Sequence, residues 1–243
     1  MATLRLLFAV TCYLLFFATF LYLVGFVTDL AVPRSVDTGP AAATAAAILI
    51  DAALIAVFGL QHSVMARPGF KRGITRVLHP AIERSFYVLA TVAVLWLMFA
   101  LWRPIPAIAW SAERPSAVTL LWALCAMGWG TIFISTWLLD HFELFGLKQA
   151  WTHWRGLTER PPQFRQPLFY RFVRHPIYLG MLFAFWAIPT MTWGHLLFAG
   201  GMTVYILIGI RFEEQDLIAQ LGEAYTGYRK RVGMLIPGIG KAR

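Results

Sequence analysis

The chain has 243 residues, of which 59% are hydrophobic and only 14% are charged. A soluble domain carries about 25% charged residues, so this composition argues for a membrane protein. The formal charge of +9 would suit a nucleic-acid-binding protein if the basic residues shared a soluble face, but here they lie between apolar runs. We therefore expect no nucleic-acid partner.

Six apolar runs follow one another along the chain, and each is a candidate membrane-spanning helix. A helix needs about 20 mostly apolar residues to cross the hydrocarbon core of a bilayer. The last two runs are short and only three residues apart, so we expect a tight helical hairpin there. The six runs are residues 4–27, 41–65, 86–102, 118–139, 177–192 and 196–210.

These runs predict an all-α fold, a polytopic membrane protein of about six transmembrane helices followed by a cytoplasmic C-terminal helix. We treat residues 1–243 as a single membrane domain, with an N-terminal four-helix part (1–140) and a C-terminal part (141–243). All but three of the 21 basic residues fall on one side of the six spans, so the positive-inside rule places both termini in the cytoplasm. The exceptions are Arg34, Arg103 and Arg114.

Titratable side chains gather at the cytoplasmic helix ends of this topology. An ionisable group at membrane depth is costly unless it is paired, so such a gathering marks a functional site. Each residue also has a structural interpretation as the polar end of a span, and the hypothesis therefore rests on their conjunction. The group comprises His62, Glu83, Tyr87, Asp140, His141, Glu143, His175, Tyr178, Glu213, Glu214 and Asp216.

The rest of the sequence offers less chemistry. The outer side of the topology has no comparable group, and Asp51 is interpreted as a hydrogen-bonding partner between helices. We interpret His79, His153 and His195 as interface residues. The cysteines and histidines show no metal-ligand spacing, so we expect no metal site.

The most specific run is residues 170–180, Tyr-Arg-Phe-Val-Arg-His-Pro-Ile-Tyr-Leu-Gly. Pro176 stands where a helix would begin, at a position that needs no N–H donor. His175 and Tyr178 are three residues apart and would share one face of the first turn. The free N–H groups of that turn suit an anionic group such as a carboxylate.

Together with Glu213-Glu214, L-G-x-x-Y-x-x-Y at 221–228 and I-P-G at 236–238, this run resembles the isoprenylcysteine carboxyl methyltransferase and phospholipid methyltransferase superfamily. The resemblance implies that residues 141–243 form a cofactor-binding part and that S-adenosylmethionine binds at the cytoplasmic face. It implies contacts with the cofactor's amino-acid or adenosine portions, an acidic partner for its amino group, and side chains that close the pocket. The residues implied to contact the cofactor's amino-acid or adenosine portions are Arg174, His175, Tyr178 and Gly180. The acidic partner of its amino group would be Glu213 or Glu214, and the side chains that close the pocket would be Tyr225, Tyr228 and Arg229.

Segments 59–68, 83–87 and 140–149 are similar to bacterial methanethiol S-methyltransferases and, more loosely, to NnrU-type membrane proteins. This resemblance implies a bacterial inner-membrane enzyme that methylates methanethiol, a small thiol, to dimethyl sulfide and releases S-adenosylhomocysteine. Membrane lipid would be the other partner, with no obligate protein partner. The catalytic residues are our own hypothesis from chemistry. His62 or His141 deprotonates the thiol, Asp140 orients the resulting imidazolium, and Tyr87 belongs to the same site.

Three alternatives stay open at this point. The acceptor of the methyl group could be a lipid, a prenylcysteine or a different thiol, because the cofactor motif does not distinguish acceptors. A sterol-reductase-like protein would share a similar C-terminal membrane fold but would bind a nicotinamide cofactor. A non-enzymatic, NnrU-like membrane protein would keep the polar helix ends as structural pairs.

Overall fold

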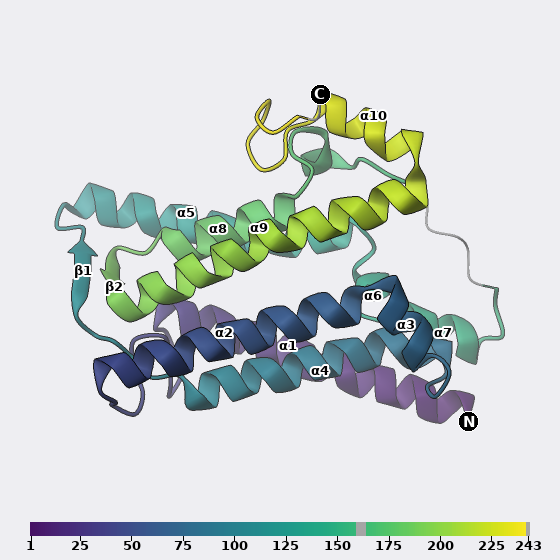
Figure 1. The fold of residues 1–243 in the computed structure, drawn as a ribbon, viewed down its shortest axis with the longest axis horizontal. Helices are drawn as coiled ribbons and strands as arrows, with labels where there is room; N and C mark the ends of the chain where they lie inside the picture. Colours follow the sequence, from purple (N-terminus) through teal and green to yellow (C-terminus); the bar gives the residue numbers. More distant parts are fainter. Residues whose placement is uncertain (159–163, 242–243) are drawn as a thin grey trace. The chain divides into compact units, whose positions relative to one another are not determined.

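The computed structural model describes residues 1–158 and 164–241, and its secondary structure is almost entirely helical (Figure 1). Two of the basic residues that are predicted to lie on the cytoplasmic side, Arg160 and Arg243, lie outside the described residues. The helices are α1 (Ala2–Thr28), α2 (Thr44–Ala66), α3 (Pro68–Ile74), α4 (Pro80–Leu101), α5 (Pro115–Leu138), α6 (His141–Leu144), α7 (Leu147–Trp154), η1 (Leu168–Arg171), α8 (Pro176–Trp186), α9 (Trp193–Leu221) and α10 (Glu223–Arg231). Two short strands, β1 (Ile108–Ser111) and β2 (Thr190–Thr192), pair with each other.

Among the described residues, five helices are long and apolar enough to cross a membrane: α1, α2, α4, α5 and α9. The all-α polytopic membrane fold is therefore confirmed. The fifth expected span, residues 177–192, corresponds to α8, which has only 11 residues and reaches about 16 Å, roughly half of a hydrocarbon core. The expected turn at 193–195 is wrong, because α9 already begins at Trp193 and strand β2 lies in the connection that follows α8.

The chain divides into two compact units whose segments alternate along the sequence. Unit 1 comprises Met1–Ala109, His141–Arg160 and Met191–Phe198, and unit 2 comprises Trp110–Asp140, Pro161–Thr190 and Ala199–Arg243. Unit 1 thus contains α1 to α4 with α6 and α7, whereas unit 2 contains α5, α8, α10 and most of α9. The functional division at residue 140 stays a prediction.

Aromatic side chains from three helices fill the core of unit 1. The Phe26 ring of α1 lies 4.9 Å, between centroids, from Phe99 of α4 and 5.9 Å from Phe198 of α9. Asp51 of α2 is buried near the same end of the unit, where it accepts a hydrogen bond of 2.9 Å from the Arg103 N–H after α4. This contact agrees with the interpretation of Asp51 as a structural link between helices.

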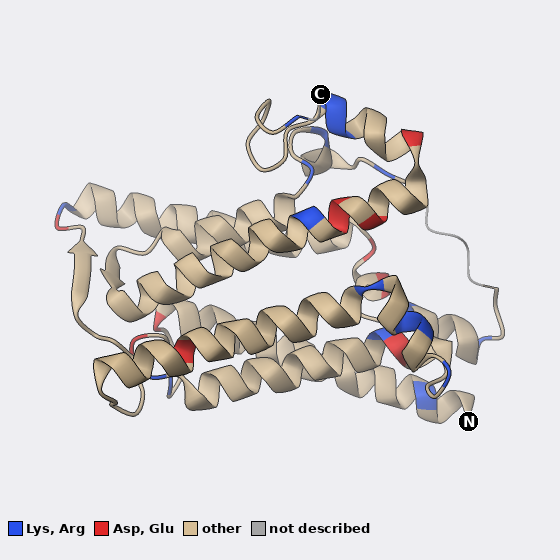
Figure 2. Cartoon of the chain, in the orientation of Figure 1, with Lys and Arg blue, Asp and Glu red and all other residues tan. Residues whose placement is uncertain are grey.

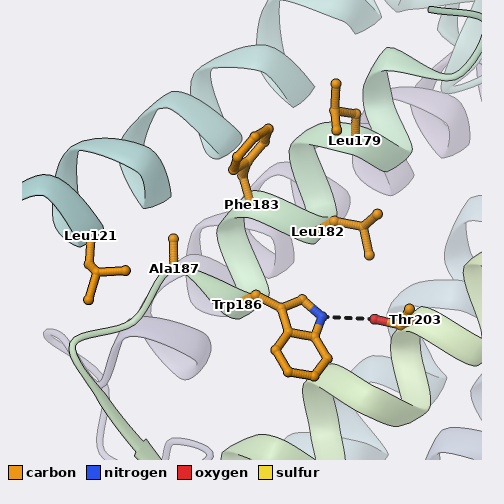
Figure 3. A pocket seen from close by; sticks show the side chains of 7 residues that line it. All are labelled: Leu121, Leu179, Leu182, Phe183, Trp186, Ala187 and Thr203. Carbon is orange, nitrogen blue, oxygen red and sulfur yellow. Dashed lines mark hydrogen bonds between the residues drawn. The ribbon is translucent and has the colours of Figure 1, made fainter. Parts of the chain in front are cut away.

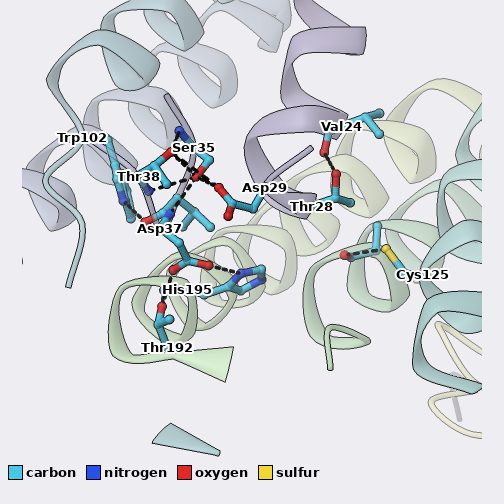
Figure 4. Close-up of polar contacts among 12 residues, drawn as sticks. Val24, Thr28, Asp29, Ser35, Asp37, Thr38, Trp102, Cys125, Thr192 and His195 are labelled. Atoms are coloured by element: carbon cyan, nitrogen blue, oxygen red, sulfur yellow. Dashed lines mark hydrogen bonds and ion pairs between the residues drawn. The ribbon is translucent and has the colours of Figure 1, made fainter. Parts of the chain in front are cut away.

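A polar network closes the end of unit 1 at which α9 begins (Figure 4). The Thr192 hydroxyl donates to Asp37 at 2.5 Å and accepts from the His195 N–H at 3.0 Å, so Thr192 caps α9. The buried His195 ring lies with its Nδ1 3.9 Å from Asp37 Oδ2. His195 was expected to be an interface residue, but its side chain is fully buried, and the polar groups of the loop around it are paired with one another, as buried loop groups require.

In unit 2, α5 and α8 pack with their backbones in close contact at two glycines. A Cβ on Gly128 would lie 2.6 Å from the Gly180 carbonyl oxygen, and a Cβ on Gly180 would lie 2.7 Å from the Gly128 oxygen. Neither distance is possible for a real side chain, so both positions need glycine. The structure thus places Gly180, an expected cofactor-binding residue, in the packing between two helices.

Candidate functional site

Charged residues in the C-terminal half of α9 form a cluster in unit 2, and they interrupt an otherwise apolar helix (Figure 2). Glu214 Oε1 accepts a hydrogen bond from Arg174 Nε at 2.7 Å, and the same oxygen lies 3.2 Å from His175 Nε2. Its other oxygen pairs with Arg229 Nε at 3.0 Å. The Glu214 side chain is only 9% exposed, so three basic groups surround one buried carboxylate. We call these four residues, with Glu213, the ionic cluster.

Arg174 fixes the C-terminal segment of the chain. Its guanidinium donates to the carbonyl oxygens of Val232 at 2.5 Å and Gly240 at 3.1 Å, while its own backbone N–H donates to the Gly233 oxygen at 2.9 Å. The residue is buried and its N–H groups serve the protein itself. The structure therefore favours a positioning role for Arg174 over the expected direct contact with the cofactor.

Glu213 differs from Glu214 in exposure. Its side chain is 42% exposed, and one oxygen accepts a hydrogen bond of 2.8 Å from the Tyr178 hydroxyl. The His175 and Tyr178 rings lie 5.5 Å apart between centroids, on the first turn of α8. That turn begins at Pro176, as the sequence predicts. Glu213 thus remains accessible to a positively charged ligand group.

Three buried tyrosines surround the carboxylates. The Tyr228 hydroxyl donates to the Tyr170 carbonyl oxygen at 2.5 Å, and Tyr225 packs beside Tyr228 on α10. Burial raises the pKa of Tyr228 to about 12, against a lowering effect of Arg174. Burial also raises the pKa values of Tyr170 and Tyr225, and the negative charge of Glu213 adds to both effects. All three phenols are therefore neutral hydrogen-bonding groups at physiological pH.

In unit 1, His62 of α2 forms a hydrogen-bonded group with Tyr87 and Thr91 of α4. The Tyr87 hydroxyl lies 2.7 Å from His62 Nε2, and Thr91 Oγ1 lies 3.2 Å from Nδ1. The Thr91 hydroxyl donates to the Tyr87 carbonyl at 3.0 Å, so it must accept from His62 Nδ1–H. When His62 Nδ1 donates to Thr91, the unprotonated His62 Nε2 accepts the hydrogen bond from the Tyr87 hydroxyl, and all three hydrogen bonds are satisfied.

His141, the other candidate base, also lies beside a tyrosine. The Tyr13 hydroxyl of α1 is 2.9 Å from His141 Nε2. Burial lowers the pKa of His141, so its ring is neutral at pH 7. Asp140 has a φ of 81°, a left-handed conformation that few non-glycine residues adopt, and it forms the bend between α5 and α6. The role of Asp140 in orienting His141 stays a prediction.

The two tyrosine–histidine pairs flank one aromatic stack. Phe16 and Phe145 lie 3.8 Å apart between ring centroids, with Phe145 4.9 Å from His141. Phe16 and Phe145 also pack against the buried cluster that contains Tyr87. Gly146 permits this arrangement, because its φ is +87° and a Cβ would lie 2.6 Å from the Ser85 nitrogen.

Comparison with known proteins adds a reaction to this geometry. No protein-family model and no solved structure matches the chain. The methanethiol S-methyltransferase of Mycobacterium tuberculosis is 49% identical over 234 residues, which cover 96% of both chains. The enzyme of that name from Pseudomonas sp. is 48% identical over 232 residues, covering 96% of this chain and 89% of its own.

The chain belongs to the methanethiol S-methyltransferase family. It is thus a methyltransferase, and its reaction requires a methyl donor. A more distant relative, Nurim of Xenopus laevis, is 30% identical over 201 residues, covering 78% of this chain and 70% of Nurim. The relationship therefore extends beyond the bacterial enzymes to a protein of an animal.

This methyltransferase also has an open apolar hollow of about 510 Å³ in unit 2 (Figure 3). Its lining is apolar except at Thr203, whose hydroxyl accepts a hydrogen bond of 2.9 Å from the Trp186 indole. The lining has no charged residue, so the hollow does not suit a charged methyl donor. The ionic cluster is the better candidate for that ligand.

Proposed function

We propose that this methyltransferase transfers a methyl group from S-adenosylmethionine to a small thiol, and that this thiol is methanethiol. The reaction takes place at the cytoplasmic face of a bacterial inner membrane. The products are dimethyl sulfide and S-adenosylhomocysteine. Nearly half of the residues are identical to those of methanethiol S-methyltransferases over almost the whole chain, which supports the acceptor. The observation that carries the choice of donor is the ionic cluster, because it offers one accessible charge of each sign.

The residues present fit the amino-acid portion of S-adenosylmethionine, which carries an ammonium and a carboxylate. Glu214 already has three basic partners, so we assign the ammonium to Glu213, whose side chain is 42% exposed. Arg229 is 28% exposed and is the basic side chain that would receive the carboxylate. Charges held in place by the protein before the ligand arrives need little reorganisation on binding.

When bound, S-adenosylmethionine supplies a methyl group on a positively charged sulfur, which a thiolate attacks. The protein has to deliver that thiolate, since a thiol with a pKa near that of cysteine, about 8.5, is mostly protonated at neutral pH. We assign this task to Tyr87 and His62, or to Tyr13 and His141. The thiol proton moves to the tyrosine oxygen while the tyrosine proton moves to histidine Nε2. A thiolate and an imidazolium result, and the tyrosine stays neutral.

The test is product formation by the purified full chain in detergent. S-adenosylmethionine and methanethiol are supplied, and dimethyl sulfide is measured in the headspace by gas chromatography. We expect Glu213→Gln to raise the KM for S-adenosylmethionine about tenfold while kcat changes little, because one charged contact contributes about 1.4 kcal/mol. Glu143→Gln is the matched control. Glu143 was expected among the polar helix ends of the site, but it pairs with Lys148 at 2.6 Å on an exposed surface of unit 1, which agrees with its structural interpretation.

Each negative result has a distinct meaning. S-adenosylmethionine binding without dimethyl sulfide would contradict the acceptor and direct the search to lipid, prenylcysteine or larger thiols. Binding of a reduced nicotinamide in place of S-adenosylmethionine would contradict the donor. Equal KM values for Glu213→Gln and Glu143→Gln would contradict the assigned role of Glu213.

A further inference from the structure

Three basic side chains that take no part in the proposed reaction meet at one end of unit 1. Arg5 of α1 lies with its guanidinium 2.8 Å from Nε2 of His153 in α7. The His153 ring lies 4.3 Å, between centroids, from that of His79, the residue before α4. Three elements therefore bring one guanidinium and two imidazoles together, next to the N-terminus of α1 (Figure 1).

The hydrogen bonds fix the tautomer of both rings. A guanidinium only donates, so His153 Nε2 must be the acceptor and His153 carries its hydrogen on Nδ1. His79 Nδ1 accepts the Ala81 backbone N–H at 3.2 Å, so His79 carries its hydrogen on Nε2. Each ring keeps one N–H that can donate to a ligand, and Arg5 keeps its remaining N–H groups.

The cluster is positive without a compensating carboxylate. Among the residues that the structure describes, no Asp or Glu forms an ion pair with Arg5 or with either ring. The first turn of α1 has no acidic residue, and Glu83, in the first turn of α4 after His79, forms no ion pair with the cluster. Burial, the charge of Arg5 and the neighbouring His153 ring all lower the pKa of His79. The N-terminus of α1 adds a partial positive charge at the same place. Such a group of donors suits an oxyanion.

The surroundings indicate where that oxyanion comes from. Arg5 lies in the first turns of a candidate membrane span, with the exposed side chains of Leu4 and Leu7 beside it. On α7, next to His153, Trp151 and Trp154 are exposed and their rings lie 5.1 Å apart. Because His153 of α7 contacts Arg5, these tryptophans lie beside the end of the candidate span α1. Exposed tryptophans in such a position are typical of the lipid headgroup level. A phosphate that belongs to a lipid would be held at that level.

We propose that Arg5, His79 and His153 bind the phosphate of an anionic phospholipid, with Trp151 and Trp154 in contact with the same lipid layer. This site is separate from the ionic cluster of unit 2 in sequence and in the residues that form it. It requires no property of the methyl-transfer reaction, so its failure would leave the proposed function intact.

Native mass spectrometry of the full chain in detergent tests the proposal, with phosphatidylglycerol titrated as the probe. A basic residue near an anionic lipid surface contributes about 1 kcal/mol, so we expect Arg5→Gln to weaken phosphatidylglycerol binding about fivefold. Arg114→Gln removes the same charge from an exposed position before α5 and should bind like the wild type. The melting temperature in the same detergent checks that each variant is folded.

His153→Gln is the second variant, in case Arg5→Gln does not fold, and it should also weaken binding. The proposal is overturned if both variants bind phosphatidylglycerol as the wild type does. It is also overturned if phosphatidylcholine binds equally well, because the site would then not select anionic lipid. Displacement of the lipid by an equal concentration of glycerol phosphate would identify a soluble phosphate compound as the ligand and contradict the lipid source.

Discussion

The ionic cluster of unit 2 and the two tyrosine–histidine pairs of unit 1 handle charge in different ways. In the ionic cluster, Glu214 is buried among Arg174, His175 and Arg229, so fixed charges neutralise one another before any ligand arrives. In the pairs, a phenol hydroxyl contacts an imidazole nitrogen, at 2.7 Å for His62 and 2.9 Å for His141. Fixed charges suit the binding of a charged donor, whereas a neutral imidazole can gain a proton.

The largest effect is expected from Glu214→Gln. Removing one partner of a buried ion pair costs about 3–5 kcal/mol, because the remaining charges stay buried without compensation. We expect about a thousandfold loss of methyl transfer and a clear drop in the melting temperature in detergent. Both are measured against Glu143→Gln, whose exposed pair should contribute less than about 1 kcal/mol. A Glu214→Gln protein that melts and turns over like this control would contradict the charge-fixing role of Glu214.

Replacing the proton acceptor should have the next largest effect. General base catalysis contributes about a hundredfold or more, so we expect one of His62→Ala and His141→Ala to lose about that much kcat/KM. Because burial lowers the pKa of His141, the ring stays neutral to a lower pH than a free histidine. If His141 is the base, kcat/KM is constant near pH 7 and falls only as the pH drops below about 6.5. Normal turnover of both variants at every pH would remove histidine from the mechanism.

Variants at the glycine contact between α5 and α8 test whether this contact is needed for helix packing. Gly128→Ala would place a Cβ 2.6 Å from backbone atoms of α8, and such overpacking costs about 1–3 kcal/mol. We expect a lower melting temperature and about tenfold less activity. Gly130→Ala, in the same helix, meets no atom within 4 Å and should be neutral or slightly stabilising. Equal melting temperatures for the two variants would show that the close approach is not needed.

The smallest effect is expected at Tyr228. Tyr228→Phe removes one hydrogen bond to the Tyr170 carbonyl, worth about 1 kcal/mol. The KM for S-adenosylmethionine should rise no more than about fivefold, with kcat unchanged. A loss as large as that of Glu214→Gln would mean that the Tyr228 hydroxyl takes part in the reaction itself.

The sequence predicted those features that depend on local pattern. Long apolar runs predicted the spanning helices, and Pro176 marked the start of α8 where it begins in the structure. The motif residues Arg174, His175 and Tyr178 were expected to share one site with the paired glutamates, and the structure brings them together.

The features that the sequence did not predict depend on contacts between distant segments. Tyr13 lies inside an apolar run, and nothing in the local sequence distinguishes it from a tyrosine that only packs in a span. In the structure its hydroxyl contacts His141. The local sequence around Thr91 is that of an ordinary helix, and it does not predict the hydrogen bond between Thr91 and His62. The tight contact of Gly128 with Gly180 likewise requires knowledge of which helices pack together.

The assignment of the methyl donor to the ionic cluster is tested by the binding of S-adenosylhomocysteine to the purified full chain. Isothermal titration calorimetry would compare the wild type, Glu213→Gln and Glu143→Gln in the same detergent. We expect binding to the wild type and to Glu143→Gln, with a Kd at least tenfold higher for Glu213→Gln. Equal affinities for all three proteins, or no binding to the wild type, would contradict the assignment of the donor to the ionic cluster.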